Sequence, residues 1–228
     1  MTRLVLVPAF ACDAALYAPL LERLGGDFEA RIVVADRPSL AECVGQVLAA
    51  AGGGAFVVGG TSFGGHVARE TALAAPDRVA GLLVMGAGAA APADPAPLAA
   101  RRAAIEGGRQ ADMLEAMAKA IVFEPEGRGR SAAGTFRDMA RRAAPALLSA
   151  QTEALATRPD RRSDLGRLRC PTLLVWGDSD EFSPPATGAD MAQAIPDAEF
   201  VLLPHCGHLP SLEAPDAVAA AIRARFGP

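Results

Sequence analysis

The sequence predicts an α/β fold: a mainly parallel sheet of about six strands, helices on both faces, and a helical cap inserted after the fourth strand. Short apolar runs alternate with amphipathic helical patterns in the first third of the chain and again near its end. These runs are apolar throughout instead of alternating with polar residues, which is typical of parallel strands covered on both faces. Repeated strand–helix units favour the same architecture, because parallel neighbours need a helical crossover between them.

Apolar runs predict the six strands at residues 4–7, 32–34, 56–58, 79–85, 172–176 and 200–203. Apolar residues at helical spacing predict helices at 16–24, from Ser39 to about residue 51, directly after Gly64, and at 186–195 and 214–226. Ser39 and Glu42 have the spacing of a capping box, which supports a helix start at that point. No hairpin is expected ahead of the first strand, because that strand already begins at about Leu4.

A cap at residues 87–169 is predicted to interrupt a core made of residues 1–86 and 170–228. This middle segment has no convincing strand pattern and contains several helical stretches rich in Ala and Arg. Pro92, Pro95 and Pro97 mark a loop at its start, because proline breaks helix and strand hydrogen bonding. A chain of 228 residues is long enough to bury a substantial core within one domain.

The composition argues against several classes of protein. Apolar residues make up 51% of the chain, charged residues 21%, and the formal net charge is -4, a balance that does not indicate nucleic-acid binding. No apolar run approaches the ~20 residues that span a membrane. The run before Cys12 faintly resembles a secretion signal, but it is short and Pro8 interrupts it. We therefore expect a cytoplasmic protein with no membrane or nucleic-acid partner.

A candidate nucleophile lies in the segment Gly60-Thr61-Ser62-Phe63-Gly64. This segment matches G-x-S-x-G and stands directly after a predicted strand and directly before a predicted helix, which is the context that the motif requires. The motif needs small residues because its serine occupies a sharp, strained turn that lifts the hydroxyl clear of the sheet. The alternative is a glycine-rich turn in which Ser62 has only a structural role.

A serine nucleophile needs a neighbouring base, and that base needs a carboxylate to orient it. Asp178 and Asp180 follow the fifth predicted strand, and His205 and His208 follow the sixth. The order serine, acid, histidine is thus satisfied, and the residues alone leave both acids and both histidines open. The third histidine, His66, lies one turn into the helix after the nucleophile and is expected to be an ordinary helix-face residue.

These motifs together resemble the α/β-hydrolase superfamily, from about Leu4 to Phe226. Gly177-x-x-Asp180-x-x-x-Pro184 is similar to the acid loop of that family, which favours Asp180. Gly207-His208 with Glu213 and Pro215 downstream is similar to its histidine loop, which favours His208. The resemblance implies a serine hydrolase of carboxylic esters with the catalytic residues Ser62, Asp180 and His208, and with no metal or organic cofactor.

Acyl transfer also needs hydrogen-bond donors where negative charge develops. One donor is expected to be the backbone N–H of Phe63, the residue after the nucleophile. By resemblance, the second is the backbone N–H of Phe10, in the loop after the first strand. Many relatives carry His-Gly in this loop, where this chain has Pro8-Ala9. A backbone donor does not require a particular side chain, so Phe10 and Phe63 are the predicted oxyanion hole.

The expected partner is a small acyl ester. The charge of the cap indicates a second possible binding partner. Between Leu98 and Cys170, thirteen Arg and one Lys stand against nine Asp or Glu, so this segment carries about +5 and the remainder about -9. An anionic substrate or an acidic acyl carrier protein would suit this charge, and the chain distantly resembles carrier-protein methyl ester esterases. The alternative is a solvated helical surface. Apolar cap residues such as Met117 and Ile121 are candidates for lining an acyl pocket.

Other functions compete with ester hydrolysis. Gly86-x-Gly88-x-x-Ala91 fits a relaxed dinucleotide fingerprint, but prolines occupy the place of the phosphate-binding helix. A zinc site from His205, Cys206 and His208 would be crowded in so short a loop. The same three catalytic residues serve thioesters, lactones, carbon–carbon bonds and perhydrolysis in relatives, and some relatives only bind a small ligand. Fold analogy does not choose among these reactions.

Overall fold

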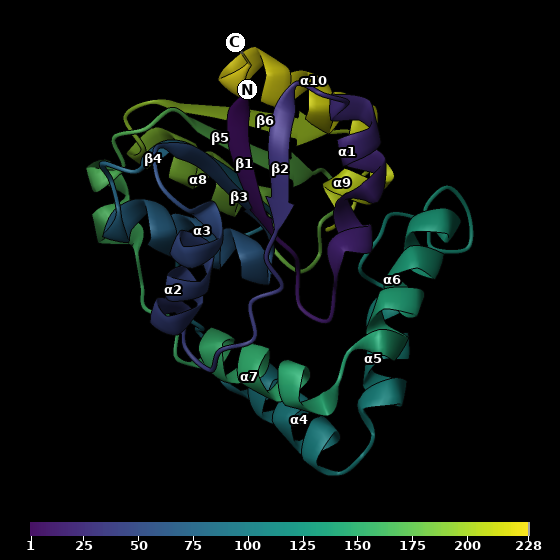
Figure 1. Ribbon diagram of the computed structural model, residues 1–228. Helices are drawn as coiled ribbons and strands as arrows, with labels where there is room; N and C mark the ends of the chain where they lie inside the picture. Colours follow the sequence, from purple (N-terminus) through teal and green to yellow (C-terminus); the bar gives the residue numbers. More distant parts are fainter. Residues whose placement is uncertain (228) are drawn as a thin grey trace.

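A computed structural model describes residues 1–227, and within this range six strands form one parallel sheet in the order β2-β1-β3-β4-β5-β6 (Figure 1). The predicted α/β architecture with six strands is confirmed. All five strand pairs are parallel. The strands are β1 (Thr2–Val7), β2 (Phe28–Ile32), β3 (Phe56–Thr61), β4 (Val79–Met85), β5 (Thr172–Gly177) and β6 (Ala198–Leu203).

Helices cover both faces of the sheet, as Figure 1 shows. On one face α1 packs against α10 and the short α9, and on the other α2 packs against α3, with α8 beside β5 and β6. Ser39 caps α2 by accepting a hydrogen bond from the Glu42 N–H, which is one of the two bonds of the expected capping box. The Glu42 carboxylate accepts from the Ser39 hydroxyl, and not from the Ser39 backbone N–H as in the full motif. The helices are α1 (Ala18–Leu24), α2 (Leu40–Ala51), α3 (Phe63–Ala74), α8 (Pro185–Ala194), α9 (Pro210–Glu213) and α10 (Pro215–Phe226).

Two details of the sequence-based prediction were wrong. The second strand was expected at 32–34, whereas β2 runs from Phe28 to Ile32. β2 is an edge strand whose middle residues are exposed, so its apolar pattern is weak, and its position is set by pairing with β1 instead. The helix expected at 16–24 is divided into a 3-10 turn, η1 (Ala14–Tyr17), and α1, which has Pro19 in its first turn.

Four α-helices and a 3-10 turn lie between β4 and β5, where a cap was predicted. α4 packs against α7 and α5 packs against α6; in Figure 1 the first pair lies below the sheet and the second pair to its right. Within residues 1–227 no helix is both long and apolar enough to cross a membrane. The cap elements are α4 (Ala96–Glu106), α5 (Gln110–Ala118), α6 (Arg130–Arg142), α7 (Pro145–Ala156) and η2 (Arg162–Arg167).

One buried side chain of the cap joins two loops of the core. Gln151 on α7 is 1% exposed. Its Oε1 accepts a hydrogen bond of 3.0 Å from the Ala11 N–H in the loop after β1, and its Nε2 donates one of 3.0 Å to the Ala35 carbonyl in the loop after β2. Both core groups are thereby satisfied without water, since a buried polar group left unpaired destabilises a fold.

We expect Gln151→Ala to lower the free energy of unfolding by about 2–6 kcal/mol, because it leaves one buried N–H and one buried C=O unpaired at about 1–3 kcal/mol each. Urea unfolding followed by circular dichroism measures the change. Ser149→Ala removes an exposed side chain from the same helix and serves as the control. Equal stability of the two variants would show that Gln151 does not connect cap and core in this way.

Candidate active site

A cavity of about 740 Å³ lies between the carboxyl ends of the strands and the cap. Ligands of α/β folds bind at this edge of the sheet, because the loops after successive strands converge there. The core contributes the loops after β1, β3, β4, β5 and β6, and the cap contributes residues of α4, α5 and α7. Met117 and Ile121, two of the apolar residues expected to line a pocket, are in its wall.

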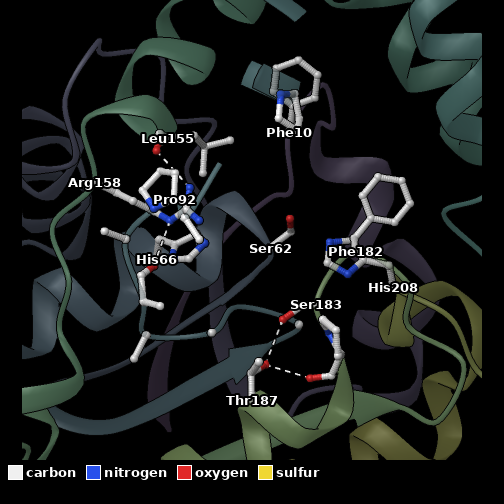
Figure 2. Close-up of a pocket in the computed structure, with 18 of the residues that line it drawn as sticks. Phe10, Ser62, His66, Pro92, Leu155, Arg158, Phe182, Ser183, Thr187 and His208 are labelled. Atoms are coloured by element: carbon white, nitrogen blue, oxygen red, sulfur yellow. Dashed lines mark hydrogen bonds between the residues drawn. The ribbon is translucent and has the colours of Figure 1, made fainter. Parts of the chain in front are cut away.

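Ser62 lies at the turn between β3 and α3 and faces this cavity (Figure 2). Its backbone has φ 54° and ψ -116°, in the region that L residues rarely adopt. Gly64 allows the turn to pack closely against the end of β1, since a Cβ at this position would lie 1.8 Å from the Val7 carbonyl oxygen. Ser62 is partly exposed although its neighbours Thr61 and Phe63 are buried, so the strained turn presents the hydroxyl to the cavity.

Asp180 and His208 come from different loops and form a buried pair. The His208 Nδ1 lies 2.8 Å and 2.7 Å from the two carboxylate oxygens of Asp180. His208 is 3% exposed and Asp180 4%. A carboxylate can only accept, so Nδ1 carries the proton and donates it, which leaves Nε2 with a free lone pair. An imidazole in this state can take a proton from a hydroxyl.

The loop after β5 and the residue after β4 hold this pair in place. Asp180 Oδ1 also accepts hydrogen bonds of 2.9 Å from the backbone N–H groups of Phe182 and Ser183. The Phe182 ring stacks on the His208 ring with 5.2 Å between centroids. Gly86 has φ 61°, and a Cβ on it would lie 3.0 Å from the His208 ring and 3.1 Å from Asp180 Oδ2. The absence of a side chain at Gly86 therefore leaves room for Asp180 and His208. This role is unrelated to the dinucleotide-binding motif that Gly86 also matches.

Glu213, which is part of the histidine-loop motif that the sequence shares with the family, holds this loop in place. The Glu213 carboxylate accepts hydrogen bonds from the backbone N–H groups of Phe123, Gly207 and Leu209, at 2.7, 2.9 and 3.0 Å. Burial raises the pKa of the Glu213 carboxyl, and the three N–H donors oppose that shift. Because Phe123 belongs to the cap segment, Glu213 positions His208 and ties the cap to the core.

Of the two acids and two histidines that the sequence left open, the structure pairs Asp180 with His208. Asp178 accepts from the Ser179 hydroxyl and the Cys206 N–H, and it forms no hydrogen bond with a histidine ring in the described residues. His205 is exposed and packs against the Phe123 ring. Ser62 and His208 line the same cavity, while no hydrogen bond joins their side chains within residues 1–227. Such bonds are often long until substrate binds.

The predicted oxyanion donors belong to residues near Ser62: Phe63 follows it in the chain, and Phe10 lines the same cavity. Phe63 is the first residue of α3, so its N–H has no carbonyl to bond within the helix. Phe10 lines the cavity in the loop after β1, where the Cys12 N–H donates to the Ala9 carbonyl at 3.1 Å and closes a tight turn. In the part of the chain that the structure describes, neither the Phe10 nor the Phe63 N–H donates to a side chain or a loop carbonyl.

The Tyr17 hydroxyl fixes the relative position of the two loops that carry these donors. It donates to the Val7 carbonyl at 2.7 Å and lies 3.1 Å from the Thr61 hydroxyl oxygen. Val7 ends β1 and Thr61 ends β3, so a single buried side chain joins the loop of Phe10 to the turn of Ser62. Burial raises the pKa of the Tyr17 hydroxyl, which therefore stays protonated and can donate.

His66 also lines the cavity, although it was expected to be an ordinary helix-face residue. It lies four residues after Ser62, and residues four apart share a helix face, so this spacing was the signal for its place. Arg69 donates to His66 Nδ1 at 2.9 Å, which puts the His66 proton on Nε2. Burial, with the charges of Arg69 and Arg158, holds the pKa of His66 well below its usual value. His66 is consequently a neutral hydrogen-bond donor.

Two arginines of the cap, Arg101 and Arg158, also line the cavity. Their position in the cavity wall was not predicted from the sequence. The Arg101 guanidinium lies over the Phe10 ring, 4.1 Å from its centroid. Arg158, just beyond α7, donates to the carbonyls of Leu155 and Ala90 at 3.0 and 3.3 Å. The cavity therefore combines an apolar wall with cations from the cap.

Comparison with known proteins places the chain in a family. The model of the α/β hydrolase fold matches residues 34–215. A pimeloyl-[acyl-carrier protein] methyl ester esterase of Nitrosomonas europaea is 30% identical over 180 residues, which cover 72% of this chain and 68% of the relative. A 2-hydroxy-6-oxononadienedioate/2-hydroxy-6-oxononatrienedioate hydrolase of Cupriavidus pinatubonensis is 29% identical over 163 residues, which cover 65% of this chain and 54% of the relative. The match thus spans about half the length of that hydrolase.

Solved structures agree over almost the whole chain. A thermophilic esterase from Thermogutta terrifontis, determined with malate bound, has a TM-score of 0.88 and 29% sequence identity, covering 98% of this chain and 89% of that chain. The enol-lactonase from Burkholderia xenovorans LB400 has a TM-score of 0.89, covering 99% of this chain and 91% of that chain. Its identity of 20% shows a shared fold only.

We expect Gly86→Ala to slow the reaction of Ser62 with a fluorophosphonate by roughly 10-fold. The added Cβ would displace the His208 ring by a few tenths of an ångström, and a displacement of about 1 Å costs roughly 100-fold. Labelling rates measured by mass spectrometry test this.

Gly108→Ala is the matched control for Gly86→Ala. Gly108 has φ 69°, so alanine meets the same backbone strain there, but nothing lies within 4 Å of the added Cβ. The two variants should lose similar stability, about 1–2 kcal/mol for the left-handed conformation, and only Gly86→Ala should lose reactivity. Equal labelling rates in both variants would contradict a role for this contact.

Proposed function

Since the chain belongs to the α/β hydrolase fold family, we propose that it is a serine hydrolase that cleaves carboxylic esters through an acyl-enzyme, with Ser62, His208 and Asp180 as its catalytic residues. The carrying observation is the buried Asp180–His208 hydrogen bond beside a cavity that also presents the strained Ser62. This combination of a nucleophile, a base with a fixed tautomer and an orienting carboxylate has the roles that acyl transfer requires.

In the first half of the proposed reaction, the Ser62 Oγ attacks the acyl carbonyl carbon while His208 Nε2 takes the hydroxyl proton. The Asp180 carboxylate holds the ring and stabilises the imidazolium that forms. Negative charge develops on the carbonyl oxygen, where the Phe10 and Phe63 N–H groups donate to it. The tetrahedral intermediate then collapses, His208 protonates the departing alkoxide oxygen, and an alcohol leaves.

The second half releases the acid. Water replaces the alcohol beside His208, which takes one of its protons as the water oxygen attacks the acyl carbon of the ester formed on Ser62. The same backbone donors hold the second oxyanion. Collapse of this intermediate breaks the bond to Ser62 Oγ, and His208 returns the proton to that oxygen. These steps use only protein groups and water.

Two features favour an ester over the other substrates of this chemistry. The cavity has a largely apolar wall that includes Met117, Ile121 and Leu155, which suits an acyl chain. Relatives by sequence and by structure include esterases. Thioesters, lactones and perhydrolysis remain alternatives for the same three residues, and a ligand-binding role without turnover is the alternative outside catalysis.

Cleavage of a carbon–carbon bond is a second candidate function. Several curated relatives are named as hydrolases of 2-hydroxy-6-oxononadienedioate, and one is 29% identical over 163 residues. In such a reaction the leaving group is a carbon atom, which His208 would have to protonate in place of an alkoxide. Loss of the dienoate absorbance on adding the protein would distinguish this reaction from ester turnover.

An acidic acyl carrier protein is a further proposed partner, based on the charge of the cap and on the carrier-protein esterase among the relatives. Many cap arginines are already paired: Arg102 with Glu153, Arg137 with Glu115 and Arg141 with Asp138. This pairing reduces the positive charge available at the surface. Binding that does not weaken with added salt would count against a carrier partner, because surface charges are screened.

We expect Ser62→Ala to lower kcat on p-nitrophenyl esters by roughly 10⁴ or more, as removal of a catalytic nucleophile does. The substrate for this measurement is chosen by first testing the unchanged protein on a panel of esters of varied acyl length, together with a methyl ester on a carrier protein. Ser163→Ala changes an exposed serine of η2 and should keep full activity. Turnover by Ser62→Ala close to that of the unchanged protein would rule out Ser62 as the nucleophile.

A further inference from the structure

Among the charged side chains lining the cavity, Arg101 and Arg158 stand apart. Arg162 is exposed and paired with Asp160. The carboxylates of the wall, Asp94 and Asp190, are both exposed. Arg101 and Arg158 are half-buried, and neither forms an ion pair with a carboxylate within residues 1–227. In a chain where most arginines are paired, two unpaired ones thus face the same cavity.

The two guanidinium groups have donors to spare. Arg158 uses Nε and Nη1 on the carbonyls of Ala90 and Leu155, which leaves Nη2 without a protein acceptor in the described residues. Arg101 has a buried Nη1 with no hydrogen-bond partner, and its contact with Phe10 is through the ring face. A buried donor without an acceptor destabilises a fold, so an unpaired cation in a cavity wall indicates an anion supplied from outside.

The surroundings of these arginines are also positive. Burial lowers the pKa of Arg101 to about 10, and the charge of Arg158 contributes to that shift. Both guanidinium groups remain protonated at neutral pH, and both side chains line the same cavity. His66 adds a neutral Nε2–H donor to the same wall. Arg69, behind His66, donates to the carbonyls of Ala87 and Gly88. An anion at this end of the cavity would meet donors on several sides.

The position of these groups relative to Ser62 decides which part of a substrate they meet. In Figure 2, Arg158 and His66 lie on one side of Ser62, and His208 with Phe182 lies on the other. A leaving group must lie beside His208, which protonates it. The opposite side of Ser62 therefore receives the acyl part of the substrate, and Arg158 lies on that side. Arg101 lines the same cavity from α4, over the Phe10 ring.

We propose that Arg101 and Arg158 bind a carboxylate at the far end of the acyl group, so that the substrate is a half ester of a dicarboxylic acid. This inference rests on the proposed function. A guanidinium matches a carboxylate with two parallel N–H donors, which a neutral acyl chain cannot use. Hydrolysis adds one water across the ester bond and gives an alcohol and a dicarboxylate.

Paired substrates test the proposal by kinetics. The monomethyl esters of succinic, glutaric, adipic and pimelic acids are compared with the matching ester-amides, in which a primary amide replaces the free carboxylate. We expect kcat/KM to be roughly 10- to 100-fold higher for the best acid than for its amide, since hydrogen bonds to charged groups are worth about 1.5–3 kcal/mol. Arg158→Gln and Arg101→Gln should each remove most of that preference, and Arg158→Lys should keep part of it.

The control is Arg102→Gln. Arg102 follows Arg101 on α4, but it is exposed and paired with Glu153. This variant should keep the preference for the acid. The ratio of acid to amide is the readout, because loss of Arg101 from the Phe10 ring is expected to slow both substrates. No preference at any chain length, or an equal preference in Arg158→Gln and Arg102→Gln, would overturn the proposal.

A binding experiment separates this inference from the proposed function. Calorimetry with Ser62→Ala measures the affinity for the free dicarboxylates and for the corresponding diamides. Binding of a dicarboxylate that is lost in Ser62→Ala with Arg158→Gln supports the carboxylate site even if no ester is hydrolysed. Ester hydrolysis without any discrimination between dicarboxylates and diamides would leave the proposed function standing and overturn the site.

Discussion

The candidate site depends on the hydrogen bond between the Asp180 carboxylate and the His208 ring. The two residues are 28 positions apart and belong to loops that follow neighbouring parallel strands, β5 and β6. Parallel pairing brings the carboxyl ends of these strands together, so the sheet, and not either loop alone, creates the contact. Because the pair is buried, solvent cannot compete for the carboxylate, and the ring is held in one tautomer.

Several backbone contacts serve this pair without touching the cavity. Glu213 satisfies three N–H groups around the histidine loop, and Tyr17 joins the ends of β1 and β3 beneath the serine turn. Each contact places one loop relative to its neighbour across the sheet edge. Precision at the site therefore comes from polar groups behind it, which is the general requirement for holding reactive side chains in position.

The fold was largely predictable because its central strands are apolar throughout and its helices have clear periodicity. The position of β2 was predicted wrongly, because an edge strand needs few apolar residues and its position is set by pairing with β1. Ser62 was predictable from a local motif, and Asp180 and His208 from motifs in the expected order. Arg101 and Arg158 were not predictable, because their contacts with the core loops depend on how the cap packs. Local sequence patterns carry no information on that packing.

The Gln151 contacts have a consequence for access to the cavity. The side chain belongs to α7, and it bonds at once to the loop that carries Phe10 and to the loop after β2. Displacing α7 from the sheet would break both bonds and leave the Ala11 N–H, next to Phe10, without its partner. Any widening of the cavity on this side is therefore coupled to loosening the loop that carries a predicted oxyanion donor.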